Sequence, residues 1–341
     1  MDNHFISSGK IRQVTFIAIL VILGWLLFRE LQTFVPACLG AITLYVIMRK
    51  WMIQLVQERK WKSGRAAGLL MLTSFLVIML PVWLVINLLS AKVNFAVAHS
   101  SELIAGLEGF IKNIEQKTGY ELLNEKNLDA VSRFVAQKLP SVVGATFNTI
   151  TTIAAMYFVL YFMLVNGRQM EKSVCDILPM HQNNLNKVGD EVKNMVISNA
   201  IGIPLIALAQ GIVGLLAYWL LGVKEPMFWF AITCITSMLP IVGAAFAYVP
   251  LGLIFFANGE IWRGVVMLIY GFGVIGTVDN IFRFTLQKKI GNIHPLITVF
   301  GVIAGISLFG FIGLIFGPLL ISLFLLLLKI YRQEFATSSS K

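Results

Sequence analysis

The residues best placed for chemistry stand near the end of a long apolar run. Asp279 and Asn280 occur in the stretch VIGTVDNIFRFTLQKK, residues 274–289, and Asp279 is the only acidic residue inside any long hydrophobic stretch of the sequence. A charged side chain at the centre of a membrane helix costs about 2.5 to 3.5 kcal/mol on insertion scales, so it normally faces a cavity or a partner. Asp279 could therefore bind and release a proton or a sodium ion during a transport cycle.

A structural role accounts for the same residue. Arg283 follows Asp279 by four positions, which places the two side chains on one face of a helix, where they can form an ion pair near the membrane surface. In the functional alternative, Arg283 stabilises the charged form of Asp279 or contacts an anionic group of the substrate. Periodicity does not separate these interpretations, and both stay open.

Two amide side chains, Asn199 and Gln210, lie in an apolar span expected at residues 197–221. Amides in membrane helices usually hydrogen bond to a neighbouring helix, and less often bind a substrate. The candidate substrate-binding or ion-binding residues are therefore Asp279, Asn280, Arg283, Gln210 and Asn199.

The composition indicates which elements must position these residues. Of the 341 residues, 57% are hydrophobic and only 13% are charged, which is too few polar side chains to cover a soluble globule. Several segments pass the test of about 18 consecutive apolar residues that marks a membrane-spanning helix. The sequence predicts an all-α polytopic membrane protein with about eight membrane segments, whose first partner is the lipid bilayer.

The net charge of +10 comes from basic residues that set the orientation in the membrane, and it does not indicate a nucleic-acid partner. The basic residues lie at helix ends and in short loops, and residues 49–65 hold six of them with one acid. Because cytoplasmic loops of membrane proteins are enriched in Lys and Arg, we expect residues 49–65 and both termini in the cytoplasm. No nucleic-acid-binding signature accompanies the charge.

The pattern of apolar and charged segments divides the chain into four parts. Residues 1–91 carry N-terminal membrane helices, residues 141–335 form the C-terminal membrane core, and residues 336–341 are a flexible tail. Residues 92–140 mix charge evenly and show helical periodicity, which predicts two amphipathic helices outside the bilayer. This insert is either a small cap or a lid or docking surface.

Two apolar stretches, residues 227–257 and 293–328, are too long for one crossing of about 20 residues. Each is either a long tilted helix or a hairpin that turns within the membrane. Hairpins are favoured, because they leave the basic cluster RFTLQKK, residues 283–289, in the cytoplasm. The residues expected to break the helices are Pro240, Gly243, Gly310, Gly313 and Pro318.

Such breaks have functional meaning in membrane proteins. Backbone groups that leave a helix at membrane depth need protein or a wet cavity to satisfy them. Transporters use the broken ends as binding sites, and two Gly/Pro-interrupted segments in one chain indicate such a site. The alternative is a purely structural role, in which the prolines only kink helices and the glycines only allow helices to pack closely.

The sequence offers little for enzyme chemistry. It contains no HExxH, no GxSxG and no second membrane-embedded acid to pair with Asp279, and its three cysteines are widely spaced. We therefore expect no enzyme activity, no cofactor and no metal. The nucleotide-binding loop GxxxxGK[ST] is also missing, so ATP is not expected to be the direct energy source.

The string AQGIVGLLAYWLLGVKEPMFWFAITCITSMLPIVGAAFAYVPLG, residues 209–252, resembles the signature of the AI-2E (autoinducer-2 exporter) family. The Asp279-Asn280 pair, His294-Pro295 and the closing LFGFIGLIFGPL are similar to the family's second block. The resemblance implies a bacterial inner-membrane transporter named for export of autoinducer-2, a small polar quorum-sensing signal. It also implies antiport of sodium and protons in some members, and a homo-oligomer such as a pentamer.

The function expected from the residues and the resemblance together is secondary transport. The chain would export a small polar solute, or exchange cations, using a proton or sodium gradient. The alternative is a passive oligomeric channel or a membrane scaffold without coupled transport.

Overall fold

The computed structural model describes residues 8–98, 146–177, 180–239, 243–278, 281 and 295–332 of the chain. Within these residues all regular structure is helical and there is no strand, which confirms the expected all-α membrane protein. The described helices include five that are long and apolar enough to cross a membrane, or six if one sharply bent pair counts as a span. Three further apolar helices are shorter, so the expected total of about eight segments stays a prediction.

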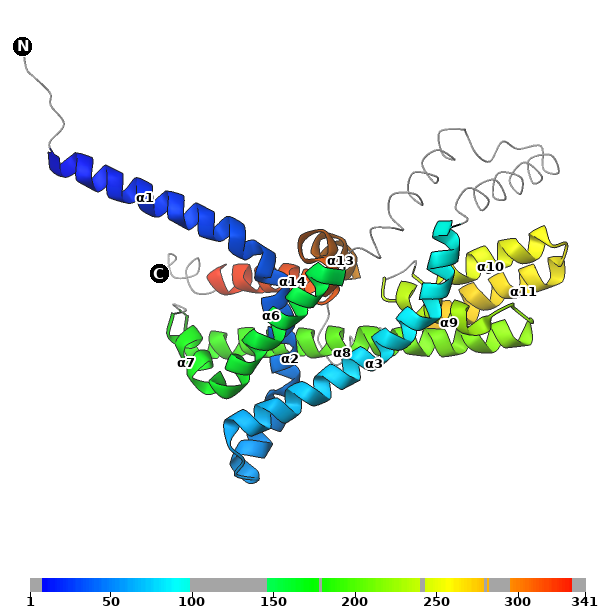
Figure 1. Ribbon diagram of the computed structural model, residues 1–341, viewed down its shortest axis with the longest axis horizontal. Coiled ribbons are helices and arrows are strands. Elements are labelled where there is room, and N and C mark those ends of the chain that lie inside the picture. The colour runs from blue at the N-terminus through cyan, green and yellow to red at the C-terminus, as the bar shows by residue number, and fades with distance from the viewer. Residues whose placement is uncertain are drawn as a thin grey trace, which may run out of the picture.

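The N-terminal helices follow one another without a loop between them. Helix α1 (Ser8–Leu31) passes through the 3-10 turn η1 (Gln32–Phe34) into α2 (Val35–Ile53), which ends in the π-turn η2 (Gln54–Glu58). The two helices meet at a bend, and α1 extends away from the rest of the molecule (Figure 1). The side chains of α1 from Arg12 onward are exposed, so lipid or another subunit must cover them.

Helix α3 (Ser63–Ala98) is a single helix of 36 residues with Pro81 inside it. Proline is tolerated in membrane helices because neighbouring groups satisfy the freed carbonyl. The helix continues to Ala98, past residue 91, where the sequence predicted the membrane part to end. Residues 99–145, which hold most of the expected insert, lie outside the described residues.

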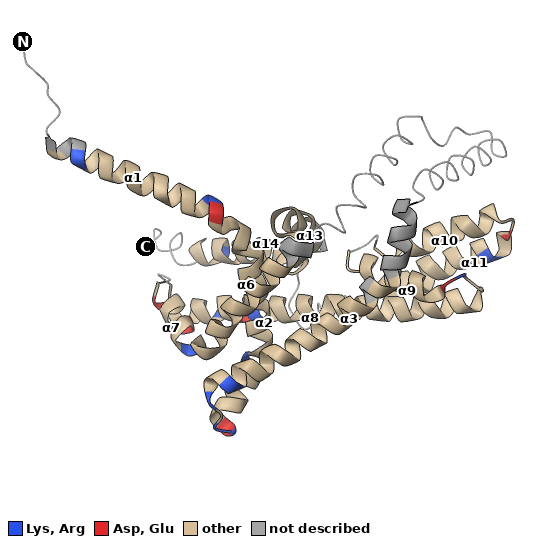
Figure 2. Ribbon diagram, viewed as in Figure 1, with Lys and Arg blue, Asp and Glu red and all other residues tan. Residues whose placement is uncertain are grey.

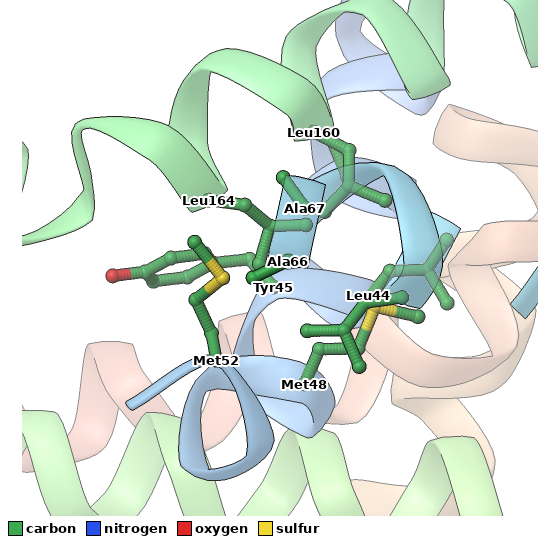
Figure 3. Packing of buried hydrophobic residues seen from close by; sticks show 10 residues of the cluster. Leu44, Tyr45, Met48, Met52, Ala66, Ala67, Leu160 and Leu164 are labelled. Atoms are coloured by element: carbon green, nitrogen blue, oxygen red, sulfur yellow. The ribbon is translucent and has the colours of Figure 1, made fainter. Parts of the chain in front are cut away.

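Helix α6 (Thr146–Val165) packs against α2 and α3, and α7 (Gly167–Ile177) then turns away by 88°. Bulky apolar side chains of α2 and α6 enclose two alanines near the start of α3 in one buried cluster. Figure 3 shows these residues packed together. Its labelled members are Leu44, Tyr45, Met48, Met52, Ala66, Ala67, Leu160 and Leu164.

A polar contact fixes α7 against α2. The Arg49 guanidinium makes a two-pronged ion pair with the Glu171 carboxylate, and the Tyr45 hydroxyl donates a hydrogen bond to Glu171 Oε1 at 2.8 Å. The hydrogen bond from Arg49 lowers the pKa of Glu171 below its ordinary value of 4.5, although partial burial opposes the shift. The hydrogen bond from Tyr45 and the positive charges of Arg49 and Arg168 act in the same lowering direction.

This contact predicts a loss of stability in acid. Because the folded-state pKa of Glu171 is depressed, its contribution is present above about pH 4.5 and is lost as the pH falls through the folded-state value. At pH 7 we expect Glu171→Gln to destabilise the full chain by about 1 kcal/mol, as is usual for a partly exposed ion pair. Thermal unfolding in detergent, followed by circular dichroism at pH 7 and pH 3, measures the difference. If the difference in unfolding temperature between wild type and variant is the same at pH 7 and at pH 3, the Glu171 pKa is not lowered in the folded protein.

Helix α8 (Gln182–Leu220) connects the two halves of the molecule. It has 39 residues, so the amphipathic lead-in and the span expected at residues 197–221 form one continuous helix. Its N-terminal part packs on α2 and α14, where Met195 and Val196 meet Phe316 and Leu319. Its C-terminal part packs beside α9 and the helices that follow (Figure 1).

Three shorter helices and a π-helix complete that second part. Helices α9 (Pro226–Thr236), α10 (Ala245–Ala257) and α11 (Ile261–Tyr270) precede the π-helix η3 (Gly271–Ile275). The turn from α8 to α9 is tight because Gly222 and Glu225 both adopt positive φ, after which Pro226 starts α9. The buried side chains between these elements include Tyr218, Leu251, Phe255, Met267 and Ile275.

The C-terminal apolar stretch is a helical hairpin. Helix α13 (Pro295–Phe309), the 3-10 turn η4 (Gly310–Ile312) and α14 (Gly313–Tyr331) follow one another, and α13 packs along α14. Both over-long apolar stretches are therefore interrupted, as the sequence predicted.

Candidate transport site

The first break lies between α9 and α10. Helix α9 ends at Thr236 and α10 begins at Ala245, so the interruption coincides with the predicted segment TSMLPIVG, residues 236–243. Gly243 fits against the end of α9, where a Cβ atom would collide with the carbonyl oxygens of Thr236 and Leu239. Pro240 lies outside the described residues.

Buried hydroxyl groups lie on the face of α9 that leads into this break. Thr233 Oγ1 donates to the Trp229 carbonyl at 2.7 Å and lies 2.8 Å from the Tyr218 hydroxyl of α8. Ser237 follows Thr233 by four residues and is only 5% exposed. In the described part of the chain its hydroxyl has no hydrogen-bond partner. A buried polar group left unpaired costs about 1–3 kcal/mol, so this position would be stabilised by a polar ligand or water.

Gln210 connects α8 to the π-helix. Its side chain is 3% exposed, and its Nε2 donates a hydrogen bond of 3.1 Å to the Ile275 carbonyl oxygen. The wide turn of η3 is marked by the Gly276 N–H, which bonds to the Gly271 carbonyl five residues back. Short π-helical turns inside α-helices are frequent at functional sites. Gln210 therefore holds the backbone of the π-helix at Ile275, which precedes Asp279 by four residues in the sequence.

The second break depends on glycine for two reasons. Gly310 adopts a φ of +63°, a conformation that other residues enter only with strain. Close contact between α13 and α14 requires Gly301 and Gly305 on one helix and Gly313 and Gly317 on the other. A Cβ atom at any of these four would overlap backbone of the facing helix.

Pro318 does not lie in the break, contrary to the sequence expectation. It sits inside α14, five residues after the helix begins at Gly313. A Cβ atom on Gly301 would lie only 2.6 Å from the Pro318 backbone nitrogen and Cα, so the proline packs against that glycine of α13. The missing N–H of proline thus falls at a helix crossing, whereas Gly310 and Gly313 bound the turn itself.

Asn199 joins α8 to this second hairpin. Its Nδ2 donates a hydrogen bond of 3.2 Å to the Ile315 carbonyl oxygen of α14, and the side chain is half-buried. Asn199 and Gln210 are eleven residues apart, close to three full turns, so they project from nearly the same face of α8. One helix thus carries an amide bonded to each of the two interrupted regions.

The remaining sequence candidates lie outside the described residues. These are Asp279, Asn280 and Arg283. The chain is helical on either side, at residues 276–278 and at Ile281. Whether Asp279 pairs with Arg283 or faces a cavity therefore stays a prediction.

Sequence reasoning missed the hydroxyl groups of α9. A usable signal existed, because Thr233 in α9 and Ser237, the residue that follows the helix, are four residues apart in a largely apolar segment. Their partner Tyr218 could not be found in the same way, since it belongs to another helix.

The chemistry available at the first break is that of backbone and neutral side chains. The described residues contain no group of three or more His, Cys, Asp or Glu that could hold a metal ion. Hydroxyls, amides and the carbonyl groups at the end of α9 can bind a cation, whereas the start of α10 favours an anion. No side chain caps the first N–H groups of α10 at Ala244.

Comparison with known proteins agrees with this architecture. The family model described as AI-2E family transporter matches residues 15–333. A protein of Aquifex aeolicus is 28% identical over 299 residues, which is 81% of this chain and 85% of the relative. A protein of Mycobacterium tuberculosis strain H37Rv is 21% identical over 359 residues, covering 97% of this chain and 90% of the relative. Both relatives are named "Putative transport protein". The chain belongs to the AI-2E transporter family.

Proposed function

We propose that this chain is a secondary transporter that moves a small polar solute, such as autoinducer-2, out of the cell, or exchanges cations. A proton or sodium gradient supplies the energy. Family membership supports the class of protein, and the interrupted helices support the mechanism, because secondary transporters place their binding sites at discontinuous membrane helices. The chain acts as a carrier and performs no covalent chemistry.

The observation that carries the proposal is the first break and its buried Ser237. The Ser237 hydroxyl is 5% exposed and lacks a partner among the described residues. Such a group destabilises the folded protein unless a polar ligand or water hydrogen bonds to it. The end of α9 and the start of α10 lie close together at this break, where Gly243 fits against the Thr236 and Leu239 carbonyl oxygens. A small polar solute or a hydrated ion suits such a mixture of donors and acceptors.

Asp279 is the coupling residue in this proposal. In the sequence it comes four residues after Ile275, whose carbonyl oxygen accepts the buried hydrogen bond from Gln210. Protonation or sodium binding at Asp279 would change the local charge as the transporter cycles. Asn280 and Arg283, which lie near Asp279 in the sequence, are the other residues assigned to this site.

The charge distribution supports a bacterial inner-membrane location with both termini in the cytoplasm. The connection from α2 to α3 is strongly basic, whereas the turns at the ends of α8 and α10 hold a balanced mixture (Figure 2). By the positive-inside rule, the former lies in the cytoplasm and the latter outside. The exposed apolar surface of α1 suits a homo-oligomer, for example a pentamer, in which α1 contacts lipid and neighbouring subunits.

A flux assay tests the proposal. The full chain is reconstituted in proteoliposomes, a pH or sodium gradient is imposed, and movement of autoinducer-2 and of sodium is measured. We expect accumulation against the solute gradient, which collapses when an ionophore removes the driving ion gradient. Equilibration without accumulation in every gradient would contradict coupled transport.

A passive oligomeric channel or a scaffold is the second candidate. The observation that favours it is the long exposed α1, which offers a large surface for assembly. A channel would equilibrate solute at a rate that ionophores do not change, and a scaffold would move none, so the same assay distinguishes the three.

A further inference from the structure

A cavity of about 290 Å³ lies where α2, α6 and α7 meet. Its walls come from the last turns of α2 and α6, the π-turn η2 and the start of α7. The residues that matter for its chemistry are Tyr45, Arg49, Met52, Gln57, Leu164 and Arg168. Proposed transport at the breaks does not use any of them.

The cavity is amphiphilic. One part of the wall is apolar and belongs to the buried cluster, with Met52 and Leu164 lying close to the ring of Tyr45 (Figure 3). The other part is polar and is lined by Arg49 and Arg168. A ligand that fits both parts has a polar end and an apolar end.

The polar part has an excess of positive charge. Glu171 neutralises Arg49, but Arg168 adds a second guanidinium on the exposed side of α7. The neighbouring connection of residues 59–65 contributes further lysine and arginine, which Figure 2 shows in blue close to the start of α3. Guanidinium groups bind phosphate through paired hydrogen bonds, so the favoured ligand group is a phosphate.

The cavity opens at the level of the membrane surface. Helix α6 has 20 residues, about the number that crosses the hydrocarbon, and α7 turns by 88° directly after it. On α7, Met170, Val174 and Ile177 follow a spacing of four and three residues and form one apolar face. Val174 and Ile177 are 52% and 78% exposed. A short helix with this pattern lies in the interface, its apolar face toward the acyl chains.

We propose that this cavity binds the phosphate headgroup of an anionic membrane phospholipid, with the start of the acyl chains against Met52 and Leu164. Arg168 and Arg49 hold the phosphate, and Gln57 hydrogen bonds to the remainder of the headgroup. Basic pockets between membrane helices at the cytoplasmic surface suit such headgroups. This inference is independent of the transported solute and of energy coupling.

The chain offers a matched pair of variants. Arg168→Gln and Lys172→Gln each remove one positive charge from an exposed position of α7, but only Arg168 lines the cavity. The full chain, purified in detergent and stripped of lipid, is titrated with dioleoyl-phosphatidylglycerol and with dioleoyl-phosphatidylcholine, and bound lipid is counted by native mass spectrometry. Gel filtration checks that each variant keeps the elution volume of the wild type.

We expect phosphatidylglycerol to bind about tenfold more tightly than phosphatidylcholine, because both lipids carry the phosphate but the positive choline group of the second is repelled by the excess positive charge at the cavity. Arg168→Gln should abolish that preference, whereas Lys172→Gln should change it less than about twofold. Arg168→Lys should give an intermediate preference, because it keeps the charge without the paired hydrogen bonds. Equal effects of the two glutamine variants would overturn the proposal, as would equal binding of the two lipids. Displacement of phosphatidylglycerol by inorganic phosphate would identify a site for a free anion instead and would also overturn it.

Discussion

Asp279→Asn is expected to abolish gradient-coupled transport and to leave the folded structure intact. Asparagine has nearly the same shape as aspartate, but it cannot take up a proton and carries no charge to bind sodium. If Asp279 couples ion and solute movement, flux in proteoliposomes under an imposed gradient should fall at least about a hundredfold, to the level of empty vesicles, as expected when an essential proton-transfer group is removed. Equilibrium binding of the solute should change far less.

The control for this experiment is Asp176→Asn. Asp176 lies on the exposed surface of α7, so its substitution removes one carboxylate without touching the membrane core. Coupled flux should then stay at the wild-type level. If Asp279→Asn also retains full coupled flux, Asp279 is a structural ion-pair partner of Arg283, and the coupling site must be sought elsewhere.

The second large effect is expected at the crossing of α13 and α14. A Cβ atom at Gly305 would overlap the Gly313 carbonyl oxygen and would lie 2.6 Å from Gly317 Cα. These are backbone atoms that cannot rotate away, so Gly305→Ala forces the two helices apart. We expect a loss of about 3 kcal/mol, at the upper end of the usual range for overpacking. The midpoint of thermal unfolding should then fall by on the order of 10 °C.

Gly24→Ala is the matched control. Gly24 lies in α1, where nothing stands within 4 Å of the position of an added Cβ atom. Alanine has a higher helix propensity than glycine, so this change should leave the unfolding temperature unchanged or raise it slightly. Circular dichroism in detergent measures both variants. Equal unfolding temperatures for the two would show that α13 and α14 do not pack as closely as described.

The interruptions of the two apolar stretches could be predicted from the sequence because they are local. Each stretch is too long for one crossing. Gly310 and Gly243 are also of a residue type that often ends helices. The position of Pro318 could not be predicted in the same way. Whether a proline breaks a membrane helix or merely interrupts one hydrogen bond depends on the facing surface, here Gly301, which no local pattern reveals.

The polar contacts were also predicted only in part. That Asn199 and Gln210 hydrogen bond to neighbouring helices was predicted from residue type, but their partners lie 116 and 65 residues away in sequence. The ion pair between Arg49 and Glu171 spans 122 residues and was not predicted. Which residues pair over such distances depends on how the helices pack against one another. Local sequence patterns do not show this packing.

The perpendicular junction of α6 and α7 has a mechanical consequence for the surrounding lipid. Because α6 is about 30 Å long and α7 lies across its end, the helix cannot slide to meet a thicker or thinner membrane. The ion pair between α2 and α7 stabilises the bend at this corner. A mismatch in thickness must therefore be absorbed by stretching or compressing the acyl chains beside this corner. The corner of α6 and α7 thus sets the local thickness of the acyl layer at this edge of the protein.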